Sequence, residues 1–244
     1  MVRVIDRRAW TGLNDIYDVG AVASLDDKVF VVCLNNYQRI EVYNAVSLQF
    51  LESLPIPGLG YTSWGLAACK RYNCVYASDW GNDCVHRVRL SISGNAVMRW
   101  SVASRPAGLS LTSDHNLLVA SQGEYKLQEF TTHGILLRNI PIMEKILGSQ
   151  VMQAVQLPDD LFLFTHFGTG RPAAHTVSAF SASNSGITSF SASYFGVQPL
   201  NRPAGLAVDK VGRVLVADWY NDRLLVMSLK KIRGMLSYFV GVCS

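Results

Sequence analysis

The stretch RPAGLAVDKVGRVLVADWYNDRLLVMS, residues 202–228, contains three short apolar runs separated by turn residues. Gly205 opens the first run, a charged turn around Lys210 follows it, and an Asp-aromatic loop at 218–222 separates the second run from the third. Short apolar runs bounded by such turns are typical of β-strands. If this unit recurs along the chain, the repeat predicts the fold directly.

Four further segments align with this unit when Gly205 is taken as its origin. Their origins are Gly20, Gly65, Gly108 and Gln153, the last of which stands where the other copies have glycine. Successive origins are 45, 43, 45 and 52 residues apart. A period in the forties is typical of the four-stranded blade of a β-propeller.

Each copy divides into four short strands, which in the fifth copy are expected near 205–208, 214–217, 224–227 and 237–242. Middle strands such as VLVA and VFVV are apolar on both faces, which indicates sheets that are covered on both sides. We therefore predict an all-β propeller of four-stranded antiparallel blades, with five recognisable blades and five or six in total. The approximate blades of this single domain are 17–57, 62–102, 105–142, 150–192 and 203–243.

Residues 203–227 resemble an NHL repeat, in which Pro and Gly precede an apolar-Ala-Val-Asp strand and a later Ala-Asp precedes Asn and Arg. Residues 63–89 match this pattern well, whereas the copy from Pro106 keeps the opening but has Ser121 where Asp is usual. The resemblance implies a propeller that usually closes with six blades. It also implies the recognition domain of a ubiquitin-ligase or scaffold protein, which binds other proteins or single-stranded RNA.

The composition excludes disorder, because 49% of the 244 residues are hydrophobic, only 16% are charged and the mean hydropathy is +0.18. The sequence contains no run of 18 apolar residues, so no membrane span is expected. The net charge of +4 is low for a dedicated nucleic-acid binder. The start MVRVIDRRAW lacks the apolar segment of a signal peptide, so we expect a cytoplasmic protein or a mature extracellular domain whose leader is missing.

In a propeller, the loops between second and third strands and the loops that join blades lie on one face. Each second-to-third loop of this chain contains an aromatic residue, and cations stand close to most of them. We predict a binding rim in which the aromatic side chains stack or become buried and the cations hold acidic groups. The alternative is that each aromatic seals the seam to the next blade. The predicted binding residues are Tyr37, Arg39, Trp80, Arg105, Tyr125, Lys126, Phe167, Arg202, Trp219 and Arg223.

The hypothesis is a non-catalytic recognition or scaffold domain for a protein or peptide, with no catalytic residue, metal or cofactor. One alternative is single-stranded RNA binding on the same face, which the low net charge disfavours. The other is a metal-dependent propeller hydrolase or lyase that uses the central channel. The innermost strands, such as GLAAC and GLAVD, carry small and apolar residues and almost no metal ligand, and Asp209 lies at the far end of its strand.

The remaining polar residues are interpreted as structural. Cys69 and Cys74 could face each other across a hairpin but are expected to be reduced, and with Cys84 they lack a fourth zinc ligand at a familiar spacing. His166 is expected at the surface of the rim, where it could act as an acid or base. The Asp and Asn side chains of the loops are expected to fix turns. These are Asp79, Asn82, Asp218 and Asn221, with Arg87 and Arg223 expected to pair with the carboxylates.

Overall fold

The computed structural model describes most of the chain with side chains. The described residues are 18–34, 38–60, 62–91, 94–124, 126–142, 149–168, 175–181, 184–190, 198–230 and 232.

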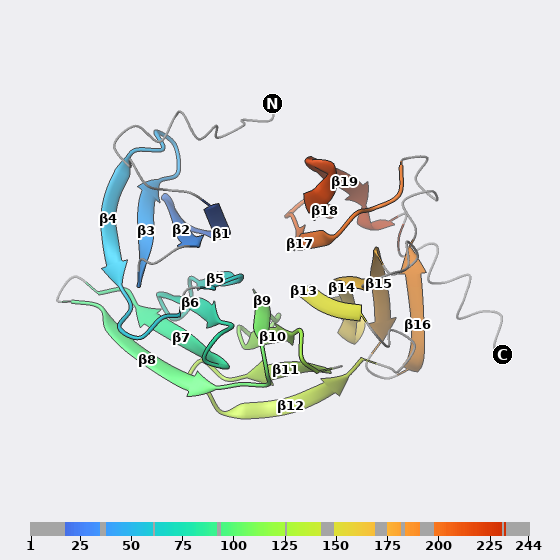
Figure 1. Ribbon diagram of the computed structural model, residues 1–244, viewed down its shortest axis with the longest axis horizontal. Helices are drawn as coiled ribbons and strands as arrows, with labels where there is room; N and C mark the ends of the chain where they lie inside the picture. Colours follow the sequence, from blue (N-terminus) through green and yellow to red (C-terminus); the bar gives the residue numbers. More distant parts are fainter. Residues whose placement is uncertain are drawn as a thin grey trace.

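Five antiparallel sheets follow one another along the chain and around a common centre, which confirms the predicted all-β propeller with five blades (Figure 1). The first sheet contains β1 (Asp18–Leu25), β2 (Lys28–Leu34), β3 (Arg39–Asn44) and β4 (Phe50–Pro55). The second contains β5 (Leu66–Cys69), β6 (Cys74–Asp79), β7 (Cys84–Arg89) and β8 (Ala96–Ser101). The third contains β9 (Pro106–Leu111), β10 (Leu117–Ser121), β11 (Lys126–Phe130) and β12 (Leu136–Pro141).

The last two sheets differ in how many of their strands are described. The fourth contains β13 (Ser149–Leu157), β14 (Leu161–Gly168), β15 (Thr176–Ser181) and β16 (Asn184–Phe190). The fifth contains β17 (Pro203–Val208), β18 (Arg213–Asp218) and β19 (Arg223–Ser228), and its expected outer strand at 237–242 lies outside the described residues. Two short 3-10 helices, η3 (Pro158–Asp160) and η6 (Trp219–Asn221), lie in turns of these sheets. No described helix has the length and apolar character needed to cross a membrane.

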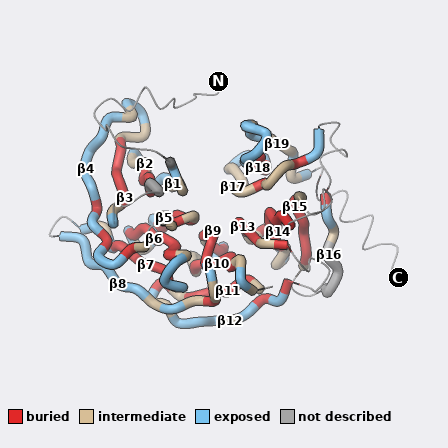
Figure 2. Tube along the Cα trace, viewed as in Figure 1, coloured by how far each residue is buried: buried red, intermediate tan, exposed pale blue. Residues whose placement is uncertain are grey.

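Consecutive sheets pack face to face, and four clusters of buried apolar side chains fill the four interfaces between them. In β6, Val75 packs toward the first sheet, whereas its neighbour Tyr76 packs toward the third. Because successive side chains of a strand point to opposite faces, a strand between two sheets buries its side chains on both faces. All six residues of β6 are buried, and the outer strands β4, β8 and β12 are largely exposed (Figure 2).

The fifth sheet is covered on one face only by the described residues. Its β19 alternates between half-buried and exposed positions, and Leu224 and Val226 are each 53% exposed. The first and fifth sheets are the two ends of the series, and a space separates their ribbons in Figure 1. The alternation in β19 is therefore the pattern expected of a sheet with a single packed face.

Glycine at the origin of the repeat allows the innermost strands to approach each other closely. A Cβ added to Gly65 would lie 2.3 Å from the carbonyl oxygen of Ala107 in β9. One added to Gly108 would lie 2.3 Å from the carbonyl oxygen of Met152 in β13. Any side chain at these positions would push neighbouring innermost strands apart. The glycines thus set the distance of the strands from the axis.

Side-chain hydroxyl groups form hydrogen bonds that join adjacent sheets at their innermost strands. Ser78 Oγ accepts a hydrogen bond from the Gly65 amide at 2.9 Å and donates one to the Ala107 carbonyl, also at 2.9 Å. Thr165 Oγ1 likewise donates to the Ala204 carbonyl of the fifth sheet at 3.0 Å. Both carbonyls lie in the innermost strands, where an unpaired buried acceptor would be destabilising. These hydrogen bonds join the second sheet to the third and the fourth sheet to the fifth.

Replacing Gly65 with alanine is expected to lower the free energy of unfolding by about 2–3 kcal/mol, because the methyl group would collide with the Ala107 carbonyl. Gly81→Ala is the matched control. There the nearest atom to the new Cβ would be Thr62 Oγ1 at 3.9 Å, so a change of less than about 0.5 kcal/mol is expected. Urea denaturation measures both values, and equal stabilities of the two variants would contradict the close-approach argument.

Candidate recognition surface

Backbone hydrogen bonds hold the second-to-third loops against the blade-joining loops on one face of the propeller. The amide of Trp80 donates to the carbonyl of Thr62 at 3.1 Å. The amide of Tyr220 donates to the carbonyl of Asn201, also at 3.1 Å. The same pattern in two sheets shows that the repeat places both kinds of loop together. The aromatic and basic residues of these loops therefore share a face.

Trp80 packs toward the third sheet and seals the seam between two blades. Its indole Nε1–H donates to Gln122 Oε1 at 3.0 Å, and the side chain of Trp80 is half-buried. The guanidinium of Arg105 lies 5.1 Å from the centre of its ring. Gln122 in turn contacts Met152 Sδ of the fourth sheet at 3.0 Å. The arrangement matches the alternative interpretation, in which the aromatic joins neighbouring blades.

Trp219 has a different environment, although it occupies the same position of the repeat as Trp80. Its side chain is 47% exposed, and the neighbouring Tyr220 is 51% exposed. The two rings meet edge to face with centroids 5.0 Å apart. On its other side, Trp219 lies 6.2 Å from the ring of Trp64, which precedes the second sheet. Three aromatic rings thus form a continuous exposed or half-exposed row.

Trp64 was not among the predicted binding residues, although a signal for it exists in the sequence. The position before the origin glycine is alanine in two other copies, Ala107 and Ala204, whereas this copy has tryptophan. A large aromatic side chain at a position where other copies have alanine indicates a contact that is specific to this copy. Here that contact is with Trp219, 155 positions further along the chain by the printed numbering.

Arg202 extends this row toward the fourth sheet. Its guanidinium lies 4.3 Å from the ring centre of Tyr220 and 5.6 Å from that of Phe167, and its Nη1 donates to the Tyr220 hydroxyl at 2.7 Å. Phe167 itself is buried beneath it, with 8% exposure, and packs edge-on against His175. We call Trp64, Trp219, Tyr220 and Arg202 the aromatic row. Two predicted residues, Trp219 and Arg202, belong to it directly.

Three other predicted cations bind carboxylates of the propeller itself. Arg39 pairs with Glu41 at 2.8 Å, Lys126 pairs with Glu124, and Arg223 Nε pairs with Asp218 at 2.7 Å. Pairs at this distance occupy the groups that were predicted to hold a ligand. The predicted residues Tyr37 and Tyr125 lie outside the described residues.

The Asp218 carboxylate is fully buried and organises the loop of the fifth sheet. It accepts hydrogen bonds from the Asn201 amide, from Asn221 Nδ2 and from Arg223 Nε, all at 2.7 Å. Arg223 also donates to the carbonyl of Gln198 at 2.6 Å. The expected structural role of this carboxylate and its pairing with Arg223 are confirmed. The corresponding expectation for Arg87 is wrong, because its Nη1 lies 3.5 Å from Met98 Sδ.

His166 is buried rather than exposed, so the prediction that it lies at the surface is wrong. It occupies the repeat position of Asp79 and Asp218, at the end of a second strand that is covered on both faces. Its Nε2 bonds Ser178 Oγ at 2.8 Å, and its ring stacks on Phe164 with centroids 5.3 Å apart. Burial, with a smaller effect of His175, lowers the pKa of His166 to about 4. The imidazole is therefore neutral near pH 7.

Cys69 and Cys74 are direct cross-strand partners of β5 and β6, as the hairpin spacing predicts. Both are buried, and both thiols are free. Among the described residues, the one group of three potential metal ligands is Asp79, Cys84 and His86, which lies at the end of β6 and in β7 rather than on an innermost strand.

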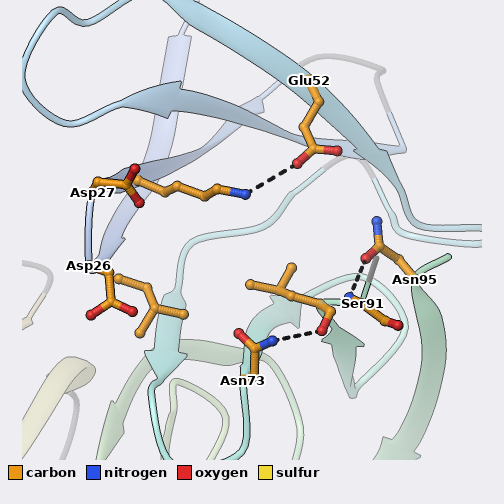
Figure 3. A pocket seen from close by; sticks show the side chains of 9 residues that line it. Asp26, Asp27, Glu52, Asn73, Ser91 and Asn95 are labelled. Carbon is orange, nitrogen blue, oxygen red and sulfur yellow. Dashed lines mark hydrogen bonds and ion pairs between the residues drawn. The ribbon is translucent and has the colours of Figure 1, made fainter. Parts of the chain in front are cut away.

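A cavity of about 380 Å³ lies on the opposite face, between the first two sheets (Figure 3). It is lined by turn residues that include Asp26, Lys28 and Glu52. Two ion pairs lie at this cavity: Lys28 lies 3.5 Å from Glu52, and Lys70 binds Asp26 at its edge. Exposed pairs of this kind contribute little to stability.

The family model described as the NHL repeat matches residues 200–227. This segment coincides with the stretch that resembles the repeat in the sequence, and it forms the fifth of five radial sheets. The chain is a β-propeller whose fifth sheet contains an NHL repeat. A comparison of this propeller with curated protein sequences finds no match.

Solved structures share the fold of this propeller at low identity. Hydrazine synthase of Kuenenia stuttgartiensis matches with a TM-score of 0.60 and 12% identity, over 92% of this chain and 81% of that one. An inactive variant of virginiamycin B lyase from Staphylococcus aureus, with quinupristin, matches with a TM-score of 0.63 and 12% identity, over 89% and 72%. The structure of U3-55K matches with a TM-score of 0.56 and 12% identity, over 86% and 64%. These likenesses show the fold alone.

Removing the guanidinium by Arg223→Ala is expected to lower the free energy of unfolding by about 2–3 kcal/mol, because it leaves the buried Asp218 carboxylate without its cation. Arg213→Ala breaks an exposed pair with Asp209 in the same sheet and serves as the control, with an expected loss below about 1 kcal/mol. Chemical denaturation of both variants compares the two losses. A loss in Arg223→Ala no larger than that of the control would show that Arg223 is not a structural residue.

The stability of the propeller is expected to fall as the pH drops from about 6.5 toward 4 because of His166. The pKa of this histidine is about 4 in the folded protein and near 6.5 when unfolded, so the unfolded chain binds the extra proton in this window. The free energy of unfolding should fall by about 3 kcal/mol over this pH range. In His166→Gln this part of the pH dependence should disappear when denaturation midpoints are measured between pH 7 and 4. An unchanged slope would contradict it.

Proposed function

We propose that this propeller is a non-catalytic recognition domain that binds a protein or peptide segment through the aromatic row. The NHL-repeat fold supports a recognition role in general. The observation that favours this surface is the exposure of Trp219 and Tyr220 side by side on the loop face. Two adjacent large aromatic side chains with nearly half of their surface in water are costly to expose unless a partner covers them.

The contacts within the aromatic row support binding without large rearrangement. Trp219 is held between Trp64 and Tyr220, and the Tyr220 hydroxyl is held by Arg202. Side chains that are already ordered lose little conformational entropy when a partner arrives. Tryptophan, tyrosine and arginine are also the residue types that contribute most to protein interfaces. A guanidinium at the end of the row adds N–H donors for a carboxylate or a backbone carbonyl.

Single-stranded RNA is the second candidate for the same surface, because bases stack on exposed aromatic rings. The pairing of Arg39, Lys126 and Arg223 with carboxylates of the propeller disfavours it, since few cations then remain to neutralise phosphates. A hydrolase or lyase in the central channel is the third candidate. The solved neighbours include a lyase and a synthase, and the close approach of glycine-containing innermost strands disfavours a ligand-lined channel in this chain.

A displayed library of random peptides tests the proposal directly. Peptides selected on the wild-type protein are expected to bind about 30-fold or more weakly to Trp219→Ala, because that side chain lies at the centre of the row. Val211→Ala removes an exposed apolar side chain from a turn on the opposite face of the same sheet and should leave affinity unchanged. Isothermal titration calorimetry measures the affinities, and circular dichroism confirms that each variant is folded.

A fluorescent 20-nucleotide uridine oligomer distinguishes the RNA alternative. Anisotropy titrations between about 50 and 500 mM salt would show a steep loss of affinity if phosphates were bound, with a log–log slope of about 0.7 per phosphate contact for a single strand. Tight, salt-sensitive binding of this oligomer that Trp219→Ala abolishes would replace the peptide proposal. Peptides whose affinity is the same for wild type and Trp219→Ala would overturn the assignment of the surface.

A further inference from the structure

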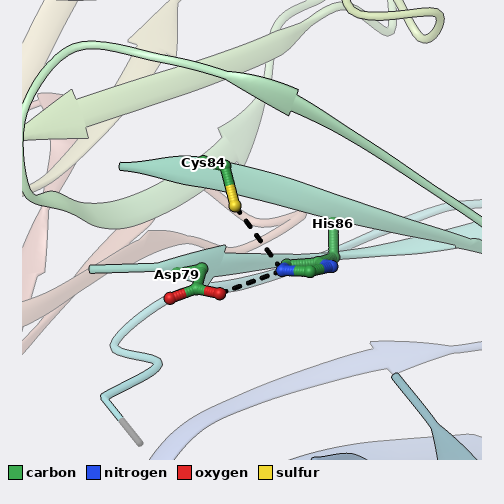
Figure 4. A group of neighbouring side chains, drawn as sticks. All are labelled: Asp79, Cys84 and His86. Carbon is green, nitrogen blue, oxygen red and sulfur yellow. Dashed lines mark hydrogen bonds and ion pairs between the residues drawn. The ribbon is translucent and has the colours of Figure 1, made fainter. Parts of the chain in front are cut away.

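Three potential metal ligands converge inside the second sheet, and none of them belongs to the aromatic row. A carboxylate oxygen of Asp79, Sγ of Cys84 and Nε2 of His86 all lie within 4.8 Å of one another, and all three residues are buried (Figure 4). Nε2 of His86 lies 3.0 Å from Asp79 Oδ2 and 3.5 Å from Cys84 Sγ. Asp79 ends β6, and the other two residues lie on the adjacent strand β7. We call these three residues the Asp–Cys–His cluster.

The repeat shows what is unusual about this cluster. Asp79 pairs in register with Cys84, and Asp218 of the fifth sheet pairs in register with Arg223. In the fifth sheet the arginine at this position provides a cation for the buried carboxylate. In the second sheet a thiol replaces that arginine, so the positive charge that neutralises the carboxylate is missing from its usual place.

We propose that the Asp–Cys–His cluster binds one divalent ion of zinc type. A zinc ion with a sulfur ligand at about 2.3 Å and a nitrogen ligand at about 2.0 Å sets these two ligands about 3.5 Å apart in tetrahedral geometry. Sγ of Cys84 and Nε2 of His86 are separated by this distance. One thiolate and one carboxylate also cancel the charge of the ion, so that the buried site is neutral.

Neighbouring residues support the ligands without belonging to the cluster. Asn82 Nδ2 and the Gly60 amide donate to Asp79 Oδ2, both at 2.9 Å, which holds the carboxylate in place. Such hydrogen bonds orient metal ligands in known sites. The described carboxylates, histidines and cysteines supply three ligands, and a water molecule would complete the tetrahedron.

Metal binding in this cluster releases the proton of the Cys84 thiol to solvent, because zinc is coordinated by the thiolate. The affinity for the ion should therefore rise with pH.

The test is a titration of chelator-treated protein with Co²⁺ and with Zn²⁺. The wild type is expected to take up one equivalent of Co²⁺ and to show a thiolate-to-metal charge-transfer band together with the intense visible bands of tetrahedral cobalt. Zn²⁺ should displace the Co²⁺. Zn²⁺ at about a hundredfold excess over its Kd should raise the melting temperature by about 5–10 °C.

Matched variants show whether the cluster is the site. Cys84→Ala should abolish the charge-transfer band and the rise in melting temperature, whereas Cys69→Ala, which removes another buried free thiol of the same sheet, should keep both. Cys84→Arg places in the second sheet the arginine that the fifth sheet has at this repeat position, and it should give a folded protein that binds no metal. A folded wild-type protein without stoichiometric binding, or binding that survives in Cys84→Ala, would overturn the proposal. Neither result bears on peptide binding at the aromatic row.

Discussion

The close contact between the innermost strands is the constraint on which the rest of the propeller depends. Gly65 and Gly108 let two neighbouring backbones come so near that no Cβ fits between them, and Ser78 bonds the amide of one strand to the carbonyl of the next. Sheets that touch at the axis and twist outward must diverge, so larger side chains fill the space further out. Phe162 and Phe164, both fully buried, pack there between the third and fourth sheets.

One repeat position holds a buried ionisable side chain in three of the five sheets. The end of the second strand holds Asp79 in the second sheet, His166 in the fourth and Asp218 in the fifth, and all three are buried. Each must find partners because a buried polar group without them is destabilising. Asp218 uses Arg223, His166 uses a serine hydroxyl, and Asp79 uses a histidine beside a thiol. The repeat therefore preserves a place for a polar group, while neighbouring strands decide what that group does.

The two DW loops show how closely similar sequences can have different surroundings. Trp80 is followed by a third sheet that offers Gln122 as an acceptor for its indole N–H, so it becomes part of the seam. Trp219 belongs to the last sheet of the series, and among the described residues its neighbours are Trp64 and Tyr220 rather than a hydrogen-bonded following blade. Trp219 is 47% exposed and accessible to a partner, whereas Trp80 is half-buried in a seam.

The sequence by itself determined the period, the five blades, the apolar character of both strand faces and the Asp–Asn turns, because these depend on neighbours within about forty residues. It also contained the substitution of Cys84 for the arginine of the repeat, which only an alignment of the copies reveals. The tertiary structure decided which aromatics are exposed, which cations are already paired and that His166 is buried. Those properties depend on contacts such as Trp64 with Trp219 and Trp80 with Gln122, whose members lie in different blades. Local periodicity contains no information about such pairs.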